Sequence, residues 1–158
     1  MADFKIAVAL TLIHEGGYVN NLNDSGGETN MGITQKDMPG QDMKTLTVEQ
    51  ATEYYAQNYW KALYSQIESQ DIASKLFDMG VLFGVGTAVR ELQRIIKIHN
   101  VPVDGQFGPR TLDVVNTAEP VGLLAAYKTS LVSHAVNIIA ASQQDRVFFA
   151  GWVRRINS

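Results

Sequence analysis

Helix signals follow one another along almost the whole chain, and this succession most constrains its fold. Apolar residues recur at helical spacing between capping residues, prolines at first helical positions and terminating glycines. Strand-like alternation is confined to two loop regions, residues 18–45 and the VPVDGQFG segment. The pattern predicts an all-α fold with at most a small β-hairpin after the first helix, around Gly26-Gly27. We expect helices at 2–14, 47–63, 71–84, 87–100, 109–118, 120–141 and 145–156.

Composition excludes several classes of protein. The chain has 158 residues, which suits one domain, and its 46% apolar and 18% charged content is typical of a globular protein. The net charge is −3 and no block of Lys and Arg occurs, which argues against a nucleic-acid-binding face. The absence of cysteine excludes disulfides, thiolate metal sites and a thiol nucleophile.

The apolar segment FKIAVALTLI lies near the start of the sequence, where an export signal would be found. It is too short to span a bilayer, and no Ala-x-Ala-like cleavage site follows it. We therefore expect it to be a buried first helix, capped by Asp3, and we expect no export signal.

Glu15 closes this apolar helix and is followed at once by Gly16 and Gly17. A helix C-terminus carries partial negative charge, so a carboxylate there is destabilised by about 0.3–1 kcal/mol. Apolar surroundings also disfavour the charged form, and a carboxylic acid that keeps its proton can act as a general acid. The glycines leave room for a ligand beside the backbone. From its position alone, a surface glutamate without a function is the more common outcome.

The polar loop that follows supplies partners for such an acid. Hydrolysis of a glycosidic bond needs a protonated carboxyl and a second, ionised group that stabilises the transition state or positions water. Asp24 lies in a polar setting unlike that of Glu15, and Thr29 would hold a water. The asparagines of the loop suit sugar hydroxyl groups; they are Asn20, Asn21, Asn23 and Asn30.

Metal and phosphate motifs fit the loop poorly. The segment from Asn21 resembles the front of a calcium loop, but Gly32 stands where a glutamate is required. The segment GGETNMGIT lacks the Gly-Lys-Ser/Thr of a phosphate loop. The three histidines are scattered without an i, i+4 pair. We expect no metal and no cofactor.

Several stretches together resemble one known family. EGGY at Glu15–Tyr18 and DSGGETNMGIT at Asp24–Thr34 are the most specific. Weaker matches extend over nearly the whole chain: YYAQNYW at 54–60, FDMG at 77–80, DGQFGPRT at 104–111 and FAGW at 149–152. The sequence is similar to glycoside hydrolase family 108, which comprises lysozyme-like N-acetylmuramidases of phages, prophages and Gram-negative bacteria.

The resemblance implies a lysozyme-like helical fold and cleavage of the β-1,4 bond between N-acetylmuramic acid and N-acetylglucosamine. The EGGY glutamate of the family is its catalytic acid and matches Glu15. Asp24 and Thr29 follow it in the order of the catalytic set of phage T4-type lysozymes. The resemblance further implies a single domain, with a catalytic segment at 1–65 and a predicted peptidoglycan-binding segment at 66–158.

Two positions depart from the family pattern. Glu28 stands where a small residue is common, and it brings a third carboxyl near the expected site, where it would compete with Asp24 as the second group. Leu82 lies in a neighbourhood where many relatives carry an asparagine, so one polar sugar contact is missing.

Further residues are candidates for contact with substrate: Tyr18, Asn30, Tyr59 and Gln93. Core packing is the alternative for Tyr59, and a hydrogen bond to the backbone is the alternative for Gln93. Asp78 lies among apolar residues and should have a structural partner if it is buried. For Arg154 and Arg155 we expect a solvated face.

The sequence thus predicts a metal-independent peptidoglycan hydrolase whose partner is the glycan strand, with neither nucleic-acid binding nor stable membrane insertion. A lytic transglycosylase would use the same glutamate but let the muramic acid 6-hydroxyl attack, leaving an anhydro end. A non-catalytic peptidoglycan-binding or phage-assembly module is the other alternative. Because no signal is visible, we expect synthesis in the cytoplasm and action in the periplasm after release, as for a prophage endolysin.

Overall fold

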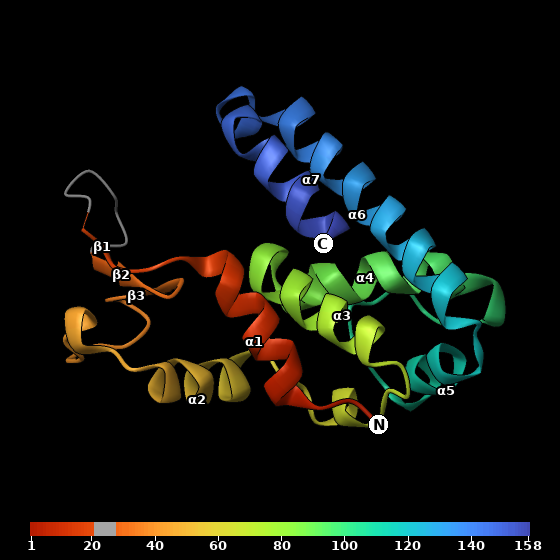
Figure 1. The fold of residues 1–158 in the computed structure, drawn as a ribbon. Helices are drawn as coiled ribbons and strands as arrows, with labels where there is room; N and C mark the ends of the chain where they lie inside the picture. Colours follow the sequence, from red (N-terminus) through yellow and green to blue (C-terminus); the bar gives the residue numbers. More distant parts are fainter. Residues whose placement is uncertain (21–27) are drawn as a thin grey trace.

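The computed structural model of this protein describes residues 1–20 and 28–158 and is mostly helical. Figure 1 shows three short strands beyond the C-terminal end of α1 and a helical hairpin that projects from the other helices. The α-helices are α1 (Phe4–Glu15), α2 (Val48–Asn58), α3 (Gln70–Phe83), α4 (Val85–Ile96), α5 (Pro109–Thr117), α6 (Pro120–Ala141) and α7 (Phe149–Asn157). Short 3₁₀ helices lie at Met43–Thr45, Ala62–Gln66, Lys97–His99 and Gln143–Phe148. The predicted all-α class with a small β element is confirmed.

Helix α1 begins at the expected cap but is only partly buried. Asp3 accepts a hydrogen bond from a first-turn amide, as an N-cap should, and Gly16 ends the helix with φ +71°. The helix was expected to be buried, but one face of it is exposed: Ile6 is 50%, Leu10 48% and Ile13 76% exposed. The buried residues are Ala7, Val8 and Thr11. These side chains are small enough to let α1 approach α3 closely.

The sheet follows α1 directly and has the order β1-β2-β3. The strands are β1 (Val19–Asn20), β2 (Glu28–Asn30) and β3 (Ile33–Thr34), and both pairings are antiparallel. Thr29 of β2 lies opposite Val19 on one side and Thr34 on the other. The sheet therefore has one strand more than the single hairpin expected, whose turn at Gly26-Gly27 lies outside the described residues.

Helix α2 has the expected start but ends early. Thr47 and Gln50 form a capping box at this start. The helix ends at Asn58 rather than near residue 63, and a 3₁₀ turn follows at Ala62–Gln66. The ring of Trp60 packs against Phe4 and Phe77, with centroids 5.3 and 5.7 Å away. This aromatic packing outweighs the helical pattern of the sequence at that point.

Helix α3 joins two hydrophobic clusters, and every residue from Ile72 to Gly80 is buried. Phe77 packs in the cluster formed with α1, α2 and the sheet, whereas Leu76 and Met79 pack in the larger cluster formed with α4 to α7. The two clusters thus share one central helix, which holds the N-terminal and C-terminal halves together.

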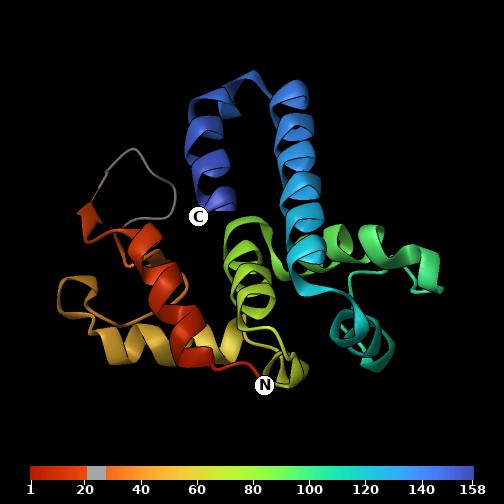
Figure 2. The same cartoon turned by 45° about the vertical axis from the view of Figure 1, so that its right-hand side comes forward.

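Helices α6 and α7 form an antiparallel hairpin, seen side by side in both views (Figure 2). Pro120 stands at the start of α6, and the Glu119 side chain accepts hydrogen bonds from the amides of Val121 and Gly122. Among the described residues, α6 alone is long and apolar enough to cross a membrane, a weak criterion that core helices also meet. Here it packs against α4 and α7.

Two fully buried tyrosines of the larger cluster differ in one respect, and this difference is testable. Tyr127 Oη donates a hydrogen bond to the Ala88 carbonyl at 3.0 Å, whereas Tyr64 Oη has no partner among the described residues. An unsatisfied buried hydroxyl is unfavourable. We expect Tyr64→Phe to leave the free energy of unfolding unchanged or raise it by about 1 kcal/mol, and Tyr127→Phe to lower it by about 1 kcal/mol. Urea denaturation of both variants measures this, and an equal loss in both would contradict the prediction.

Candidate active site

Glu15 is the last residue of α1, and its carboxyl faces α7. The side chain is 15% exposed, and Oε1 lies 2.6 Å from Nη2 of Arg155. The contact is chiefly ionic, because this oxygen accepts no hydrogen bond of good geometry from the described residues. The apolar surroundings expected for Glu15 therefore contain a cation, which offsets the unfavourable charge at the helix end.

The Arg155 guanidinium joins Glu15 to a second carboxylate, Asp78 of α3. Nη2 and Nε of Arg155 donate to Oδ1 of Asp78 at 2.9 and 3.1 Å, and Thr11 donates to the same oxygen at 3.0 Å. Burial opposes the charge of Arg155, but Asp78 and Glu15 outweigh it, so the pKa of Arg155 is raised. The structural pairing expected for Asp78 is confirmed.

The prediction that Arg155 lies on a solvated face is wrong. Its side chain is only 11% exposed, whereas the neighbouring Arg154 is exposed. Adjacent residues on a helix point about 100° apart, so only one of the two can face the interior. Which one does so is decided by the return of α7 onto α1 and α3, a long-range arrangement that no local pattern reports.

The C-terminal end of α7 is held in place by side chains from α3 and α6. Lys75 Nζ donates to the carbonyl of Arg155 at 2.9 Å, and Lys128 Nζ donates to that of Asn157 at 3.0 Å. Lysines at a helix C-terminus satisfy its free carbonyls and complement its dipole. Burial lowers the pKa of Lys75 to about 8, despite the opposing effect of Asp78. These contacts fix Arg155 beside Glu15.

The turn between β2 and β3 closes over Glu15 from the other side. Gly32 has φ +75°, and a Cβ there would collide with Glu15 Oε2 and lie 2.7 Å from Tyr55 Oη. Only glycine fits this position, because both the backbone conformation and the space require it. Tyr55 Oη donates to the Met31 carbonyl at 2.9 Å, and burial together with the charge of Glu15 raises its pKa.

The predicted partners of Glu15 lie in or beside β2. Asp24 lies outside the described residues. Thr29 is half-buried in the central strand, and its neighbour Glu28 points to the opposite face of the sheet because side chains alternate along a strand. Glu28 Oε1 accepts a hydrogen bond from Asn20 at 3.1 Å, so this third carboxyl is engaged across the β1–β2 pair.

The four residues expected to contact substrate occupy different settings. Tyr18 is 37% exposed beside the sheet, with Lys44 Nζ 5.9 Å from its ring centroid. Tyr59 is half-buried, and its ring packs 5.6 Å from that of Tyr55. Asn30 is only 8% exposed and donates to the Met43 carbonyl at 2.7 Å, a structural contact.

Of the two roles expected for Gln93, a sugar contact or a hydrogen bond to the backbone, the structure shows the second. It is fully buried in α4 and holds the Asp104-Gly105 turn that follows Val103. Its amide donates to Asp104 Oδ1 at 2.9 Å, and its oxygen accepts from the Gly105 amide at 2.8 Å. Both polar groups of Gln93 are thus occupied inside the protein, so a direct sugar contact is not compatible with this placement.

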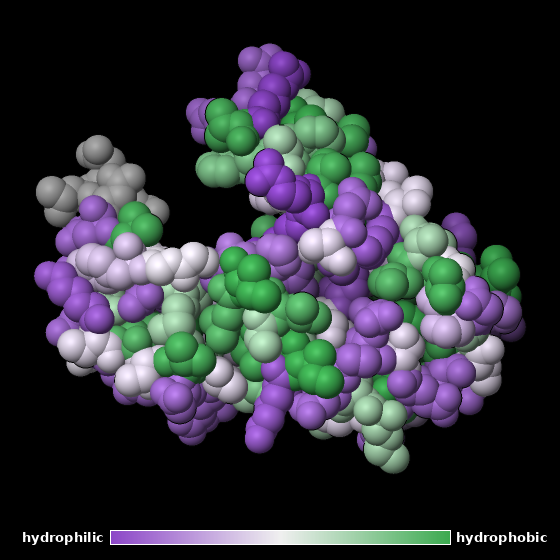
Figure 3. Space-filling view, in the orientation of Figure 1, coloured by the Kyte–Doolittle hydropathy of each residue, from purple (hydrophilic) through white to green (hydrophobic). Residues whose placement is uncertain are grey.

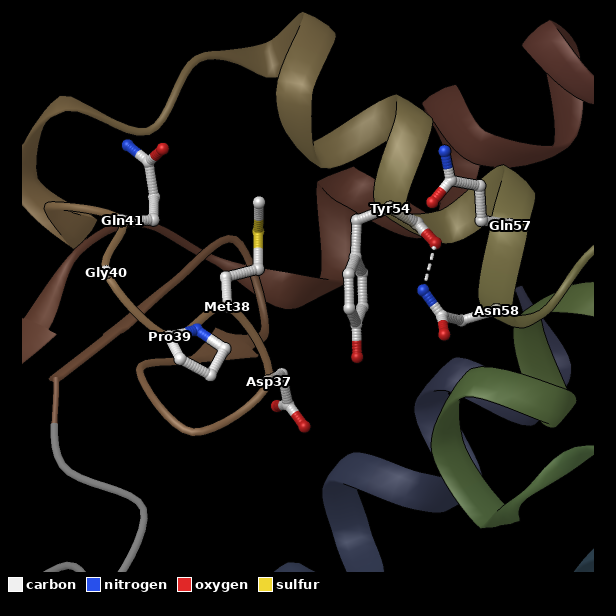
Figure 4. A pocket seen from close by; sticks show the side chains of 8 residues that line it. All are labelled: Asp37, Met38, Pro39, Gly40, Gln41, Tyr54, Gln57 and Asn58. Atoms are coloured by element: carbon white, nitrogen blue, oxygen red, sulfur yellow. Dashed lines mark hydrogen bonds between the residues drawn. The ribbon is translucent and has the colours of Figure 1, made fainter.

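A hollow between the sheet and the α6–α7 hairpin opens above the C-terminal end of α1 (Figure 3). A cavity of about 490 Å³ also lies beside this helix end; Ile13 and His14 of α1 and Asp78 of α3 line it, and Glu15 does not. A separate pocket of about 510 Å³ lies between α2 and the segment after β3, and Glu15 does not line it (Figure 4). Its lining includes Tyr54, whose pKa is raised to about 12 by burial. We therefore place the candidate site at the hollow.

The arrangement suits proton transfer at a fixed carboxyl. Arg155 and the Gly32 turn hold the Glu15 side chain from two sides, so its position relative to a ligand in the hollow is defined. Among the described residues, no group of three His, Asp or Glu side chains comes together in a way that could hold a metal ion.

Comparison with known families gives a match for each half of the chain. Residues 8–84 match the model of glycosyl hydrolase 108, and residues 87–157 match the model of a predicted peptidoglycan domain. The chain is thus a glycoside hydrolase that carries a region for peptidoglycan. More particularly, its first half belongs to the glycosyl hydrolase 108 family, and its second half belongs to the predicted peptidoglycan domain family.

Comparison with solved structures supports the fold over the whole chain. The structure of Brucella abortus SagA is similar, with a TM-score of 0.77 and 26% sequence identity, covering 98% of this chain and 89% of that one. Comparison with curated proteins gave no match.

The cation beside Glu15 yields a prediction with a close control. Arg155→Gln leaves two carboxylates without their counterion, and we expect the free energy of unfolding to fall by about 3 kcal/mol. Arg154→Gln changes the adjacent, exposed arginine and should alter stability by less than about 0.5 kcal/mol. Urea denaturation at neutral pH compares the two. Equal stability of both variants would show that the ion cluster contributes nothing.

Proposed function

We propose that this protein is an N-acetylmuramidase that hydrolyses the β-1,4 bond between N-acetylmuramic acid and N-acetylglucosamine. The observation that carries the proposal is the Glu15 carboxyl, fixed beside a hollow at the end of α1. It occupies the EGGY position whose glutamate is the catalytic acid in the family that residues 8–84 match. The peptidoglycan domain family at 87–157 supports the glycan strand as substrate.

In this proposal Glu15 donates a proton to the glycosidic oxygen as the bond to the anomeric carbon breaks. The carboxylate that remains gains negative charge during this step. Arg155 lies 2.6 Å away and stabilises the charge as it develops, without needing to reorganise. The guanidinium therefore favours the transition state and defines the donor position.

The proposed second group is Asp24, assisted by Thr29. The ionised Asp24 would stabilise the oxocarbenium-like sugar or orient a water molecule that attacks it. Thr29 is the central residue of β2, in the sheet that borders the hollow. In this proposal its hydroxyl holds that water.

We further propose that the protein acts on the cell wall in the periplasm after release from the cytoplasm, as a prophage endolysin does. The two family regions support the wall as its site of action. Stable membrane insertion is not part of this proposal, since α6 packs against α4 and α7.

The reaction is tested by mass spectrometry of fragments released from purified Gram-negative peptidoglycan. We expect the wild type to release fragments that end in reducing N-acetylmuramic acid. Glu15→Gln should lower the rate by about 10²–10⁴-fold, because it removes the proton donor. Glu28→Gln is the control, since this carboxyl pairs with Asn20 across the sheet, and it should retain most activity.

Other products would change the assignment. Anhydro ends would indicate a lytic transglycosylase, in which the 6-hydroxyl of muramic acid replaces water and Asp24 is dispensable. Peptidoglycan binding without any released fragment would indicate a binding or phage-assembly module and would contradict the proposed catalysis.

A further inference from the structure

The face of α7 that carries Arg155 continues outward as a stripe of four residues. The stripe consists of Phe148, which directly precedes α7 in helical conformation, and of Gly151, Trp152 and Arg155 of α7. Their spacing of i, i+3, i+4 and i+7 places them on one side of this segment. The adjacent side faces the core through Ile156, which is fully buried. The stripe begins where Arg155 contacts Glu15 and runs toward the tip of the α6–α7 hairpin.

Phe148 and Trp152 form a stacked aromatic pair at the outer part of this stripe. Their ring centroids are 6.0 Å apart and their planes differ by 23°. Trp152 is half-buried and is held edge-to-face by Phe83, 5.7 Å away. Phe148 is 55% exposed. Phe148 therefore offers an exposed ring to a ligand, and Trp152, itself held by Phe83, supports that ring.

Gly151 leaves open space beside this aromatic pair. A Cβ added at this glycine would meet no other atom within 4 Å, so the protein's own packing does not require glycine here. Glycine is less favourable than alanine inside a helix. A glycine at this position leaves the backbone open to close approach by a ligand.

The stripe lies next to the hollow and so is close to the candidate site. Hydrophobic residues lie along the edge of the α6–α7 hairpin that borders it (Figure 3). Because the stripe starts at the partner of Glu15, a polymer that reaches Glu15 would pass along it. A pyranose ring has a face of C–H groups that packs on an aromatic ring, and its hydroxyl groups lie at the ring edges.

We propose that Phe148, Trp152 and the space at Gly151 form a sugar-stacking site that takes a pyranose ring of the glycan strand, away from the bond that is cleaved. The proposal rests on the proposed function, because it assigns a further contact for the same substrate. Phe148 provides the exposed ring on which the sugar stacks, Trp152 holds that ring in place, and Gly151 lets the sugar approach the helix.

The test measures binding of peptide-free glycan strands by isothermal titration calorimetry, with Glu15→Gln in every protein so that no strand is cleaved. Phe148→Ala and Gly151→Ala are each added to this background. Val121→Ala is the matched control, since Val121 is 75% exposed and lies at the start of α6, at the opposite end of this helix from the hairpin tip. We expect both stripe variants to weaken binding by about three- to tenfold, and the control to leave it unchanged.

Gly151→Ala separates ligand contact from a structural role. An alanine there should raise the melting temperature while it weakens glycan binding, because it favours the helix but fills the ligand space. A change in folding alone would move the two quantities in the same direction.

Unchanged affinity in both stripe variants would overturn the proposed site, even if the wild type cleaves peptidoglycan as expected. If the Glu15→Gln protein with an unchanged stripe binds no glycan, the proposed site is overturned as well. If the wild type then also releases no fragments, the proposed function fails with it.

Discussion

Arg155 lies between two carboxylates from different helices, and the rest of the site depends on this contact. Without it, Glu15 of α1 and Asp78 of α3 would be two nearly buried negative charges with no cation between them. Removing one partner from such a cluster destabilises the fold strongly, because it leaves a buried charge unpaired, even where the intact cluster adds little net stability. The cluster therefore requires α7 to return to the same place in every molecule.

This requirement connects the two family regions. The donor carboxyl belongs to the glycosyl hydrolase region, and the cation that positions it belongs to the peptidoglycan-domain region. Lys75 and Lys128 hold the end of α7 through its carbonyls, and the Gly32 turn closes on Glu15 from the sheet. The second half of the chain thus completes the site of the first half and also forms one wall of the hollow.

Local signals predicted the helices well wherever a cap or a proline marks the boundary, as at Thr47, Pro109 and Pro120. They failed at the buried face of α1. That helix is apolar on most sides, so periodicity alone does not select a face, and close packing on α3 selects the small residues. The α2 end was also missed, because the ring of Trp60 gains more from its aromatic neighbours than from another helical turn.

The candidate site was predictable in part. Glu15 stood out because a carboxylate at the end of an apolar helix before two glycines is unusual, and the family resemblance gave it a role. Arg155 was missed because its partner lies 140 positions earlier (155 − 15) and no local spacing reports such a pair. Gln93 and Asn30 were expected to contact sugar, but their side chains bond to the protein's own backbone. Buried backbone groups in turns need hydrogen-bond partners, and these two amides supply them.

The most direct test of the central claim is a crystal structure of the Glu15→Gln protein with a bound glycan strand. The account predicts a glycosidic oxygen within about 3 Å of the side chain at position 15, which is hydrogen-bond distance. It also predicts that the strand lies in the hollow between the sheet and α7. A strand bound elsewhere, such as in the pocket beside Tyr54, would contradict the assignment of Glu15 as the proton donor.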